Sequence, residues 1–406
     1  MKPILLLILP ALILYACNST RVNKARSLQA FRQIDSLLNA DEYFKGRDAY
    51  LSVEDELTEL HRYKAGASID NLFNRLEVSN EKINKLFSDH ASDLSDMDKY
   101  QLLRVKQMNH SKLFEYKEAN EAVNEMLEKY KSHIKEEDLQ DYLNTNKIWA
   151  ALAGQPAQQL AIKDNTVLTL ERDKLGLQNL RLSVDSFHVN FIFDTGANFS
   201  TVTAATAQRM NIQLMDTTTI DVGTITGKQV KARIGVCPVF HLGGITVKNA
   251  VFLVFPDEAL AIPQADFQIN GIIGFPVIEA MKEVQLTKKG EFIVPVKKTS
   301  YSRQNMALKF LNPVIDLYGE SYTFDSGANS TILYNNYYNK HKDSIDAKFT
   351  ETDISIGGAG GNITKKGFLV PFIVTIDNRV VQLDSVQLFK ERLKGDNNFS
   401  GNIGQD

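Results

Sequence analysis

The chain has 406 residues, which is enough for two or three domains. Its 43% of apolar residues and its net charge of −3 are typical of a soluble protein body, and the near-neutral balance without a basic stripe argues against nucleic acid as a partner. Beyond the first 17 residues, no apolar stretch is long enough to cross a bilayer.

The N-terminus has the pattern of a secretory signal. Met1-Lys2 gives a basic start, an apolar run from Pro3 to Tyr15 follows, and Ala16 is a small residue at its end. The run is too short to favour a membrane-spanning helix. We therefore expect residues 1–16 to be removed and residues 17–24 to form a tether.

Leu14-Tyr15-Ala16-Cys17 also resembles the bacterial lipobox, whose cysteine is lipidated and becomes the new N-terminus. The alternative is a plain signal peptide with an incidental cysteine. Because no acidic residue closely follows Cys17, the resemblance implies a lipid anchor in the bacterial cell envelope, at the outer membrane and facing the periplasm. Cys237 then has no partner for an intramolecular disulfide, and its apolar neighbours indicate a buried thiol.

Residues 25–160 predict an all-α domain. Apolar residues recur at helical spacing from Leu28 to Leu38 and again, as one helix face, from Leu72 to Phe87. The span 100–130, with a turn into a second helix at Tyr116, loosely resembles a tetratricopeptide helix pair; an irregular helical bundle is the alternative. We expect this domain to position the rest of the chain or to dock a protein partner, and to do no chemistry.

Two β regions follow, at 165–296 and 306–406. In the first, Leu180–Val184 and Phe187–Phe193 flank the turn Asp185-Ser186, which predicts a hairpin. In the second, Pro313–Leu317 and Ser321–Phe324 predict the same hairpin around a turn of three residues. The polar segment 297–305 is the expected linker between the two regions.

Each β region carries one copy of the same short motif at the end of a predicted strand. The first copy is Asp194-Thr195-Gly196-Ala197-Asn198, and the second is Asp325-Ser326-Gly327-Ala328-Asn329. A carboxylate at a strand end, followed by a small hydroxyl residue and a glycine, suits a tight turn that points the acid into a cleft. One copy alone would carry little weight, because Asp-Thr-Gly occurs by chance in many turns.

Two further landmarks repeat in the same order. A segment punctuated by glycines follows each motif, at Gly223–Lys228 and at Gly357–Asn362. A short element then ends at Gly274, 80 residues after Asp194 (274 − 194), and at Gly404, 79 residues after Asp325 (404 − 325). Three landmarks in one order and at nearly one spacing indicate an internal duplication.

Over residues 165–406 this combination resembles the retropepsin-like aspartic peptidases. The resemblance implies two all-β lobes related by a pseudo-twofold axis, with Asp194 and Asp325 as the catalytic pair facing each other across it. Thr195 and Ser326 would hydrogen-bond across the axis and, with the glycines that follow them, hold the two catalytic loops together. The elements before Gly274 and Gly404 would pack behind the acids.

The second lobe departs from the family pattern at two points. Asn402 stands where the family usually has an apolar residue, which makes this lobe the less secure of the two. The sequence given also stops two residues past Gly404, without the helix and strand that such lobes use in their core. We expect that this lobe is truncated; the alternative is that something else, such as another chain, completes it.

The segments punctuated by glycines would be flaps that close over a substrate. The first tip is Gly223-Thr224-Ile225-Thr226-Gly227-Lys228, and the second is Gly357-Gly358-Ala359-Gly360-Gly361. The first carries an apolar β-branched side chain, whereas no side chain of the second is larger than a methyl group. We therefore expect the first flap to supply side-chain specificity and the second to offer its backbone to a peptide.

Paired carboxyl groups suit hydrolysis without a cofactor. Two neighbouring carboxylates do not both ionise readily, so the pair holds one proton over a wide pH range. The ionised acid can take a proton from water while the protonated acid polarises a carbonyl group. The chemistry needs no cofactor, metal or thiol, and the sequence has no metal-binding spacing of His or Cys.

We therefore expect a lipid-anchored aspartic endopeptidase that acts on peptides or proteins. The alternative is an inactive peptide-binding or scaffold lipoprotein that keeps the same fold.

Overall fold

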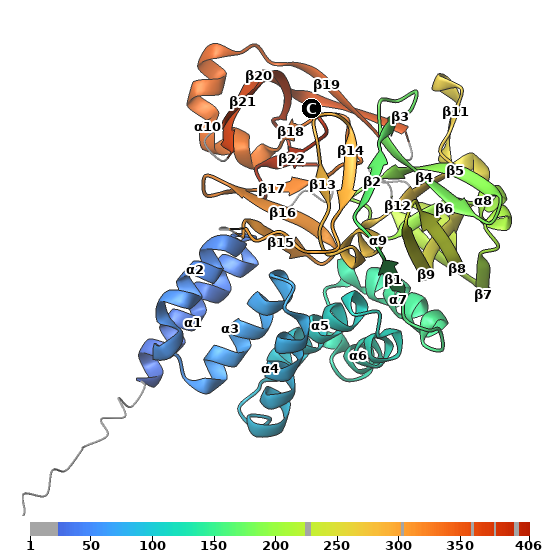
Figure 1. Cartoon of the computed structure of the whole chain (residues 1–406). Helices are drawn as coiled ribbons and strands as arrows, with labels where there is room; N and C mark the ends of the chain where they lie inside the picture. The colour runs from blue at the N-terminus through green and yellow to red at the C-terminus, as the bar shows by residue number, and fades with distance from the viewer. Residues whose placement is uncertain (1–22, 224–228, 302–303, 359–360, 377–378, 394–397) are drawn as a thin grey trace, which may run out of the picture.

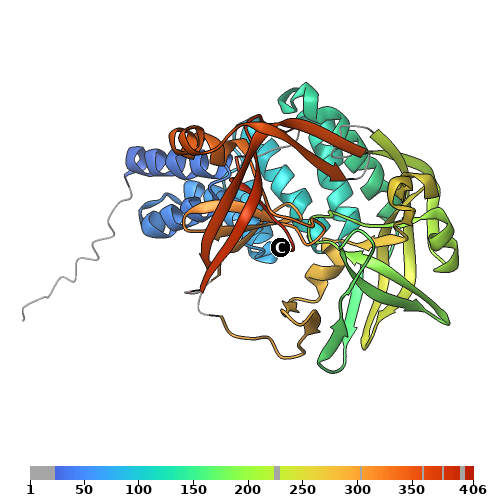
Figure 2. The same cartoon turned by 90° about the horizontal axis from the view of Figure 1, so that it is seen from above.

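The computed structural model describes residues 23–223, 229–301, 304–358, 361–376, 379–393 and 398–406. A domain of helices comes first in the chain, and two β lobes stand side by side on it (Figure 1). Seen from above, the helices pass along both lobes (Figure 2). The predicted class of fold, an all-α domain followed by two all-β lobes, is confirmed. The predicted signal and Cys17 lie outside the described residues.

The helical domain consists of three helix pairs and a further helix. Its α-helices among the described residues are α1 (Lys24–Asn39), α2 (Tyr43–Val53), α3 (Glu59–Leu72), α4 (Leu76–Asp89), α5 (Asp96–Lys112), α6 (Tyr116–Lys129) and α7 (Glu136–Leu152), with the 3-10 turns η1 (Glu54–Glu56) and η2 (Lys131–His133). None of the helices in the described segments is both long and apolar enough to span a membrane.

The same turn folds each helix pair back on itself. Asp41, Asn74 and Phe114, which follow α1, α3 and α5, are in the left-handed conformation, with φ of 62°, 59° and 60°. A left-handed residue ends an α-helix, because the chain leaves the helical path there. The prediction of one helix face from Leu72 to Phe87 is therefore wrong: Leu72 ends α3, and the later residues of the set lie on α4.

The first lobe is built around one large sheet and a small one. The nine-stranded sheet contains β1 (Gln159–Ile162), β3 (Glu171–Arg172), β4 (Gln178–Val184), β5 (Phe187–Phe193), β6 (Ser200–Thr203), β7 (Gln213–Gly223), β8 (Gln229–Leu242), β9 (Ile245–Phe255) and β12 (Gly271–Ile273). The small sheet contains β2 (Thr166–Thr169), β13 (Gln285–Leu286) and β14 (Glu291–Val294). Strand β1 pairs with β9, so this lobe begins before the expected boundary at 165.

Shorter elements complete the first lobe. They are α8 (Ala204–Arg209), η3 (Asp257–Leu260), β10 (Ala261–Ile262), η4 (Pro263–Ala265), β11 (Phe267–Gln268) and α9 (Phe275–Ala280). The core of the lobe is apolar and well buried, with Phe191, Phe193 and Phe292 at most 1% exposed.

The second lobe is one eight-stranded sheet with a helix against it. In sheet order the strands are β15 (Met306–Lys309), β16 (Asn312–Leu317), β17 (Glu320–Phe324), β22 (Gly401–Ile403), β18 (Ile332–Leu333), β21 (Arg379–Phe389), β20 (Gly361–Ile376) and β19 (Thr352–Gly358), and the helix is α10 (Asn335–Lys348). The predicted linker, 297–305, contains no helix or strand in its described part.

Both predicted hairpins are present, and the strands next to the Asp motif pair in the same way in the two lobes. In the first lobe, β12 runs parallel to β5 and antiparallel to β6. In the second, β22 runs parallel to β17 and antiparallel to β18. In each lobe a short strand, β12 or β22, thus lies between the strand before the Asp motif and the strand after it, which confirms the pseudo-twofold relation.

The helical domain shares apolar cores with both lobes. Trp149 and its neighbours on α5 to α7 pack with Ile220 and Val236 of the first lobe. Helices α1 to α3 pack with Val314 and Phe399 of the second lobe. Burial of apolar surface at both contacts stabilises one arrangement of the three parts. The helical domain is therefore a common base for the two lobes.

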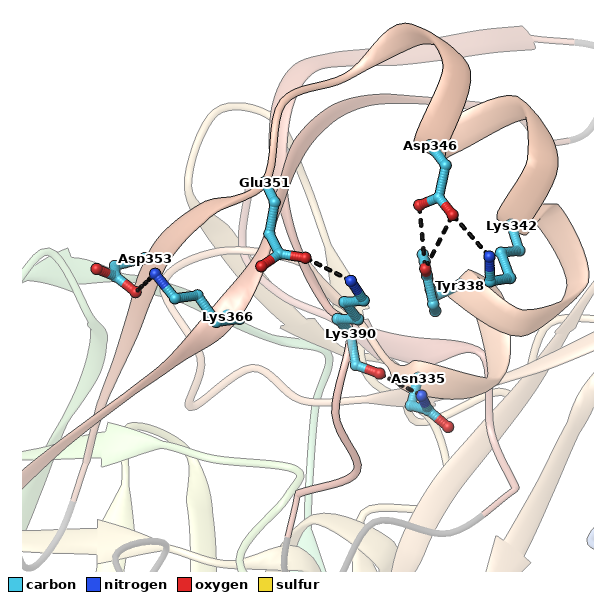
Figure 3. A network of polar contacts seen from close by, with 8 residues as sticks. All are labelled: Asn335, Tyr338, Lys342, Asp346, Glu351, Asp353, Lys366 and Lys390. Atoms are coloured by element: carbon cyan, nitrogen blue, oxygen red, sulfur yellow. Dashed lines mark hydrogen bonds and ion pairs between the residues drawn. The ribbon is translucent and has the colours of Figure 1, made fainter.

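Ion pairs and a hydrogen bond connect β19, β20 and α10 with the end of β21 in the second lobe (Figure 3). Lys366 lies 2.7 Å from Asp353, and Lys390 forms an ion pair with Glu351, at the base of the β19–β20 hairpin. Asn335 at the start of α10 donates to the carbonyl of Lys390. Exposed ion pairs contribute little to stability, so this hairpin depends mainly on its strand pairing, which includes that of β20 with β21, and on the burial of Ile354.

The packing predicts which residue of α7 matters most for stability. Trp149 is 3% exposed and stacks on Tyr116 at 6.0 Å between ring centroids. Trp149→Ala should lower the free energy of unfolding by about 3 to 5 kcal/mol, because it leaves a cavity between α7 and the first lobe. Denaturant unfolding measures this. Leu143→Ala, on the same helix but 39% exposed, is the control, and an equal loss in both variants would contradict the prediction.

Candidate active site

Each motif Asp follows directly on a central strand of its lobe. Asp194 comes after β5, and its N–H donates to the carbonyl of Ile273 over 3.1 Å. Asp325 comes after β17, and its N–H donates to the carbonyl of Ile403 over 3.0 Å. The hydrogen bonds to β12 and β22 therefore fix the backbone position of each Asp at the end of its strand.

Thr195 and Ser326 join the two catalytic loops by reciprocal hydrogen bonds. The N–H of Thr195 donates to the Ser326 hydroxyl over 3.0 Å, and the N–H of Ser326 donates to the Thr195 hydroxyl over 2.9 Å. Each hydroxyl in turn donates over 2.9 Å to a carbonyl of the opposite lobe, that of Phe324 or Phe193. Both side chains are buried, so water does not compete for these bonds.

The glycines of the two motifs allow the acids to meet. A Cβ atom on Gly196 would lie 2.7 Å from Oδ1 of Asp325, and one on Gly327 would lie 2.5 Å from Oδ1 of Asp194. Any larger residue would push the opposite carboxyl group away. Each acid thus lies over the glycine of the other loop, and the structure brings the two predicted catalytic residues together.

The surroundings of Asp194 favour its protonated form. Burial of the carboxyl group, followed by the charge of Asp325, raises the pKa of Asp194 to about 8, and a hydrogen bond between the two carboxyl groups acts in the same direction. The N–H groups of Gly196 and Ala197 donate to its Oδ1 over 2.8 and 3.1 Å and oppose the shift only in part. The pair can therefore hold one proton at neutral pH.

The short elements that end in Gly274 and Gly404 pack behind the acids. The N–H of Gly274 donates to the hydroxyl of Ser200, and the N–H of Gly404 to that of Thr331, both over 3.1 Å. A Cβ atom on either glycine would lie 2.5 Å from a backbone carbon of the facing loop. The close approach explains why both copies need a glycine there.

The predicted flaps correspond to two hairpins whose tips are only partly described. Gly223 ends β7, whereas Thr224, Ile225, Thr226, Gly227 and Lys228 lie outside the described residues. Gly357 and Gly358 end β19 and Gly361 begins β20, whereas Ala359 and Gly360 lie outside the described residues. The strands that would carry both flaps are thus present.

Three contacts between or beside the catalytic loops were missed at the level of sequence. Arg172 of β3 donates to Oε1 of Gln405 over 3.0 Å, and Asn329 donates to the carbonyl of Leu175 over 2.6 Å. Both bonds cross from one lobe to the other. Asn402 donates to Oδ2 of Asp325 over 3.1 Å. The only signal for that bond in the sequence was the departure of Asn402 from the apolar pattern.

A hollow of about 220 Å³ lies along the first lobe beside the catalytic loop. Ile192, two residues before Asp194, and Gly271 of β12 form part of its wall. Its other lining residues are mostly polar or charged, namely Glu171, Arg172, Asp173, Asn179, Asn190, Phe267, Gln268, Ile269 and Asn270. No group of three or more His, Cys, Asp or Glu in the described segments could hold a metal ion.

Comparisons with known proteins match the first lobe most directly. An aspartyl protease family model matches residues 180–277, from β4 to α9. No curated protein sequence matches the chain. Among solved structures, a retropepsin-like aspartic protease from Rickettsia conorii is 21% identical, with 34% of this chain and 91% of that chain covered and a TM-score of 0.23. Basic 7S globulin from soybean is 10% identical, with 59% and 89% covered and a TM-score of 0.36. The family match over the first lobe and the equivalent strand arrangement around Asp325 in the second support an aspartic-protease-like fold.

The raised pKa of Asp194 predicts how stability depends on pH. The folded chain keeps a proton that the unfolded chain, with an ordinary pKa of 3.8, loses between about pH 4 and pH 8. The free energy of unfolding therefore falls as pH rises through this window. Asp194→Asn removes that loss, so the variant should gain stability over the unmodified chain as pH increases from 4 to 8.

Thermal unfolding at a series of pH values measures this gain. Asp185→Asn, in the exposed turn between β4 and β5, is the control and should follow the unmodified chain throughout. A constant difference between Asp194→Asn and the unmodified chain across the window would contradict the prediction.

Proposed function

We propose that this chain is an aspartic endopeptidase whose active site is formed by Asp194 and Asp325 of one molecule. The observation that carries the proposal is the reciprocal bonding of Thr195 and Ser326, which places one acid from each lobe against the other. The raised pKa of Asp194 supports it, because a catalytic pair must hold both a proton and a negative charge near neutral pH.

The pair would hydrolyse a peptide bond without a covalent intermediate. The ionised carboxylate takes a proton from a water molecule, whose oxygen attacks the carbonyl carbon of the peptide. The protonated carboxyl group donates a hydrogen bond to the carbonyl oxygen and stabilises the negative charge that develops there. A proton then passes to the amide nitrogen, and the C–N bond breaks.

The surroundings of the pair suit an extended peptide. The hollow beside Ile192 is large enough for a side chain, and its polar lining favours polar over large apolar groups. The two hairpins β7–β8 and β19–β20 would carry the flaps. Because the Gly-rich second tip lacks large side chains, we propose that the first flap, with Ile225, supplies most of the side-chain specificity.

We also propose that the protein is lipidated at Cys17 and held at a bacterial membrane, facing the periplasm. The support is the likeness of Leu14–Cys17 to a lipobox. Three features of the sequence agree with export: the basic start, the short apolar run and the small residue before Cys17.

The dyad predicts a particular pattern of loss among variants. Asp194→Asn and Asp325→Asn should each reduce kcat/KM on a peptide library by about 10³-fold or more, because neither acid can perform both steps. The double variant should be scarcely worse than either single variant, since the two acids act as a unit. Asp185→Asn, in an exposed turn, serves as the control. Substantial activity in Asp325→Asn would show that the second lobe is not half of the site.

The anchor predicts a change in location. Cys17→Ser should move the protein from the membrane fraction to the soluble periplasmic fraction, because no lipid can then be attached. A labelled fatty acid should be incorporated into the unmodified protein and not into the variant. A variant that still sediments with membranes, together with an unlabelled unmodified protein, would refute the lipoprotein proposal.

A further inference from the structure

The two lobes differ at one pair of positions next to the acids. In the first lobe, Ile272 of β12 lies opposite Ile192 of β5. In the second lobe, the same register places Asn402 of β22 opposite Thr323 of β17. Asn402 is only 6% exposed, so its amide needs partners within the protein. A polar pair, of which Asn402 is buried and Thr323 partly buried, thus stands in the second lobe where the first has an apolar pair.

The hydrogen bonds of Asn402 connect that pair to the catalytic acid. Its Nδ2 donates to Oδ2 of Asp325 over 3.1 Å. The hydroxyl of Thr323 donates to Oδ1 of Asn402 over 2.5 Å. Because the hydroxyl occupies the oxygen end of the amide, the nitrogen end faces Asp325. An N–H donor stabilises a carboxylate more than a protonated carboxyl group.

The donors are distributed differently over the two acids. At Asp325, the N–H of Gly327 donates to Oδ1 over 2.8 Å, and Asn402 donates to Oδ2. Protonation of either oxygen would therefore weaken the hydrogen bond which that oxygen accepts. At Asp194, both backbone donors, the N–H groups of Gly196 and Ala197, bond to the same oxygen, Oδ1. A proton on Oδ2 of Asp194 therefore disturbs none of these bonds.

We propose that Asn402 is a positioning residue that assigns the single proton of the pair to Asp194 and keeps Asp325 as the carboxylate. The inference rests on the proposed peptidase function for its role in catalysis. Asp325 is then the base that takes the proton from water, and Asp194 is the acid that faces the carbonyl oxygen of the substrate. A pair that would be equivalent under exact twofold symmetry has fixed roles in this chain.

Four charged residues of the described segments near the catalytic loops have hydrogen-bond partners other than the two acids. Arg172 of β3 bonds to Gln405, and the Asp406 carboxylate accepts from the N–H and the hydroxyl of Thr331. Glu171 accepts from Asn190, and Asp173 accepts from Asn179. The pKa of Asp194, raised by burial and by the charge of Asp325, agrees with a proton on that acid.

Titration of the two carboxyl groups by carbon-13 NMR tests the proposal without any need for turnover. Aspartate labelled at the carboxyl carbon reports each ionisation, and the two single Asp→Asn variants assign the signals. In the unmodified chain, Asp325 should ionise first and Asp194 should stay protonated into the neutral range. In Asn402→Leu, the lower macroscopic pKa of the pair should rise by about one unit, because the carboxylate loses a donor.

Two further variants make the test specific. Thr323→Val keeps Asn402 but removes the hydroxyl that orients its amide, so it should shift the lower pKa in the same direction by a smaller amount. Ile272→Val, at the matching position of the first lobe, should leave it unchanged. An unchanged or lowered pKa in both Asn402→Leu and Thr323→Val would overturn the proposal, and so would a first ionisation at Asp194.

The pH profile of peptide cleavage is a second test of the role of Asn402. The acid limb of kcat/KM should move to higher pH in Asn402→Leu by the same amount as the NMR midpoint. If the unmodified chain cleaves no peptide but the NMR shifts occur as predicted, the proposed function fails and the assignment of the proton stands. If it cleaves peptides and the NMR midpoint does not move, the assignment fails alone.

Discussion

The reciprocal hydrogen bonds between Thr195 and Ser326 are the constraint on which the site depends. Each acid lies one residue before its hydroxyl residue, so the same four bonds that join the loops also set the two carboxyl groups against each other. Both acids are partly shielded from solvent at this joint, and loss of solvation together with the charge of Asp325 raises the pKa of Asp194. The contact between the lobes thus allows the pair to keep one proton near neutral pH, which acid–base chemistry requires.

The helical domain supports the two lobes in different ways. Helix α7 contacts β7, where Ile220 is buried and Asn144 donates to the carbonyl of Asp221 over 3.3 Å, close to the first flap. Trp149 also lies 6.0 Å from Phe199, which directly follows the first catalytic loop. The second hairpin, β19–β20, has exposed ion pairs at its base instead. The hairpin of the first flap therefore packs on the helical domain, whereas β19 of the second hairpin packs Ile354 against Ile332 and Phe389 of its own lobe.

Local signals in the sequence predicted the duplication, the paired Asp motifs and the hairpins at Asp185 and Tyr318, because strand alternation and turn residues act over short distances. They could not predict which surfaces the helices cover. An apolar residue such as Trp149 gives the same sequence pattern whether it packs inside a helical bundle or against a β lobe. The helix break at Asn74 was missed because apolar spacing continues on both sides of it. Asn402 was noticed only as an exception, since its partner Asp325 lies 77 residues away in the chain.

In the proposed enzyme, one chain supplies both acids of one site. Calorimetric titration with a peptide in which the scissile amide is replaced by a hydroxyethylene group tests it most directly, because such a compound mimics the tetrahedral intermediate. One inhibitor should bind per chain, and binding should be lost in both Asp194→Asn and Asp325→Asn. One inhibitor per two chains, with binding retained in Asp325→Asn, would show that two first lobes from separate molecules form the site.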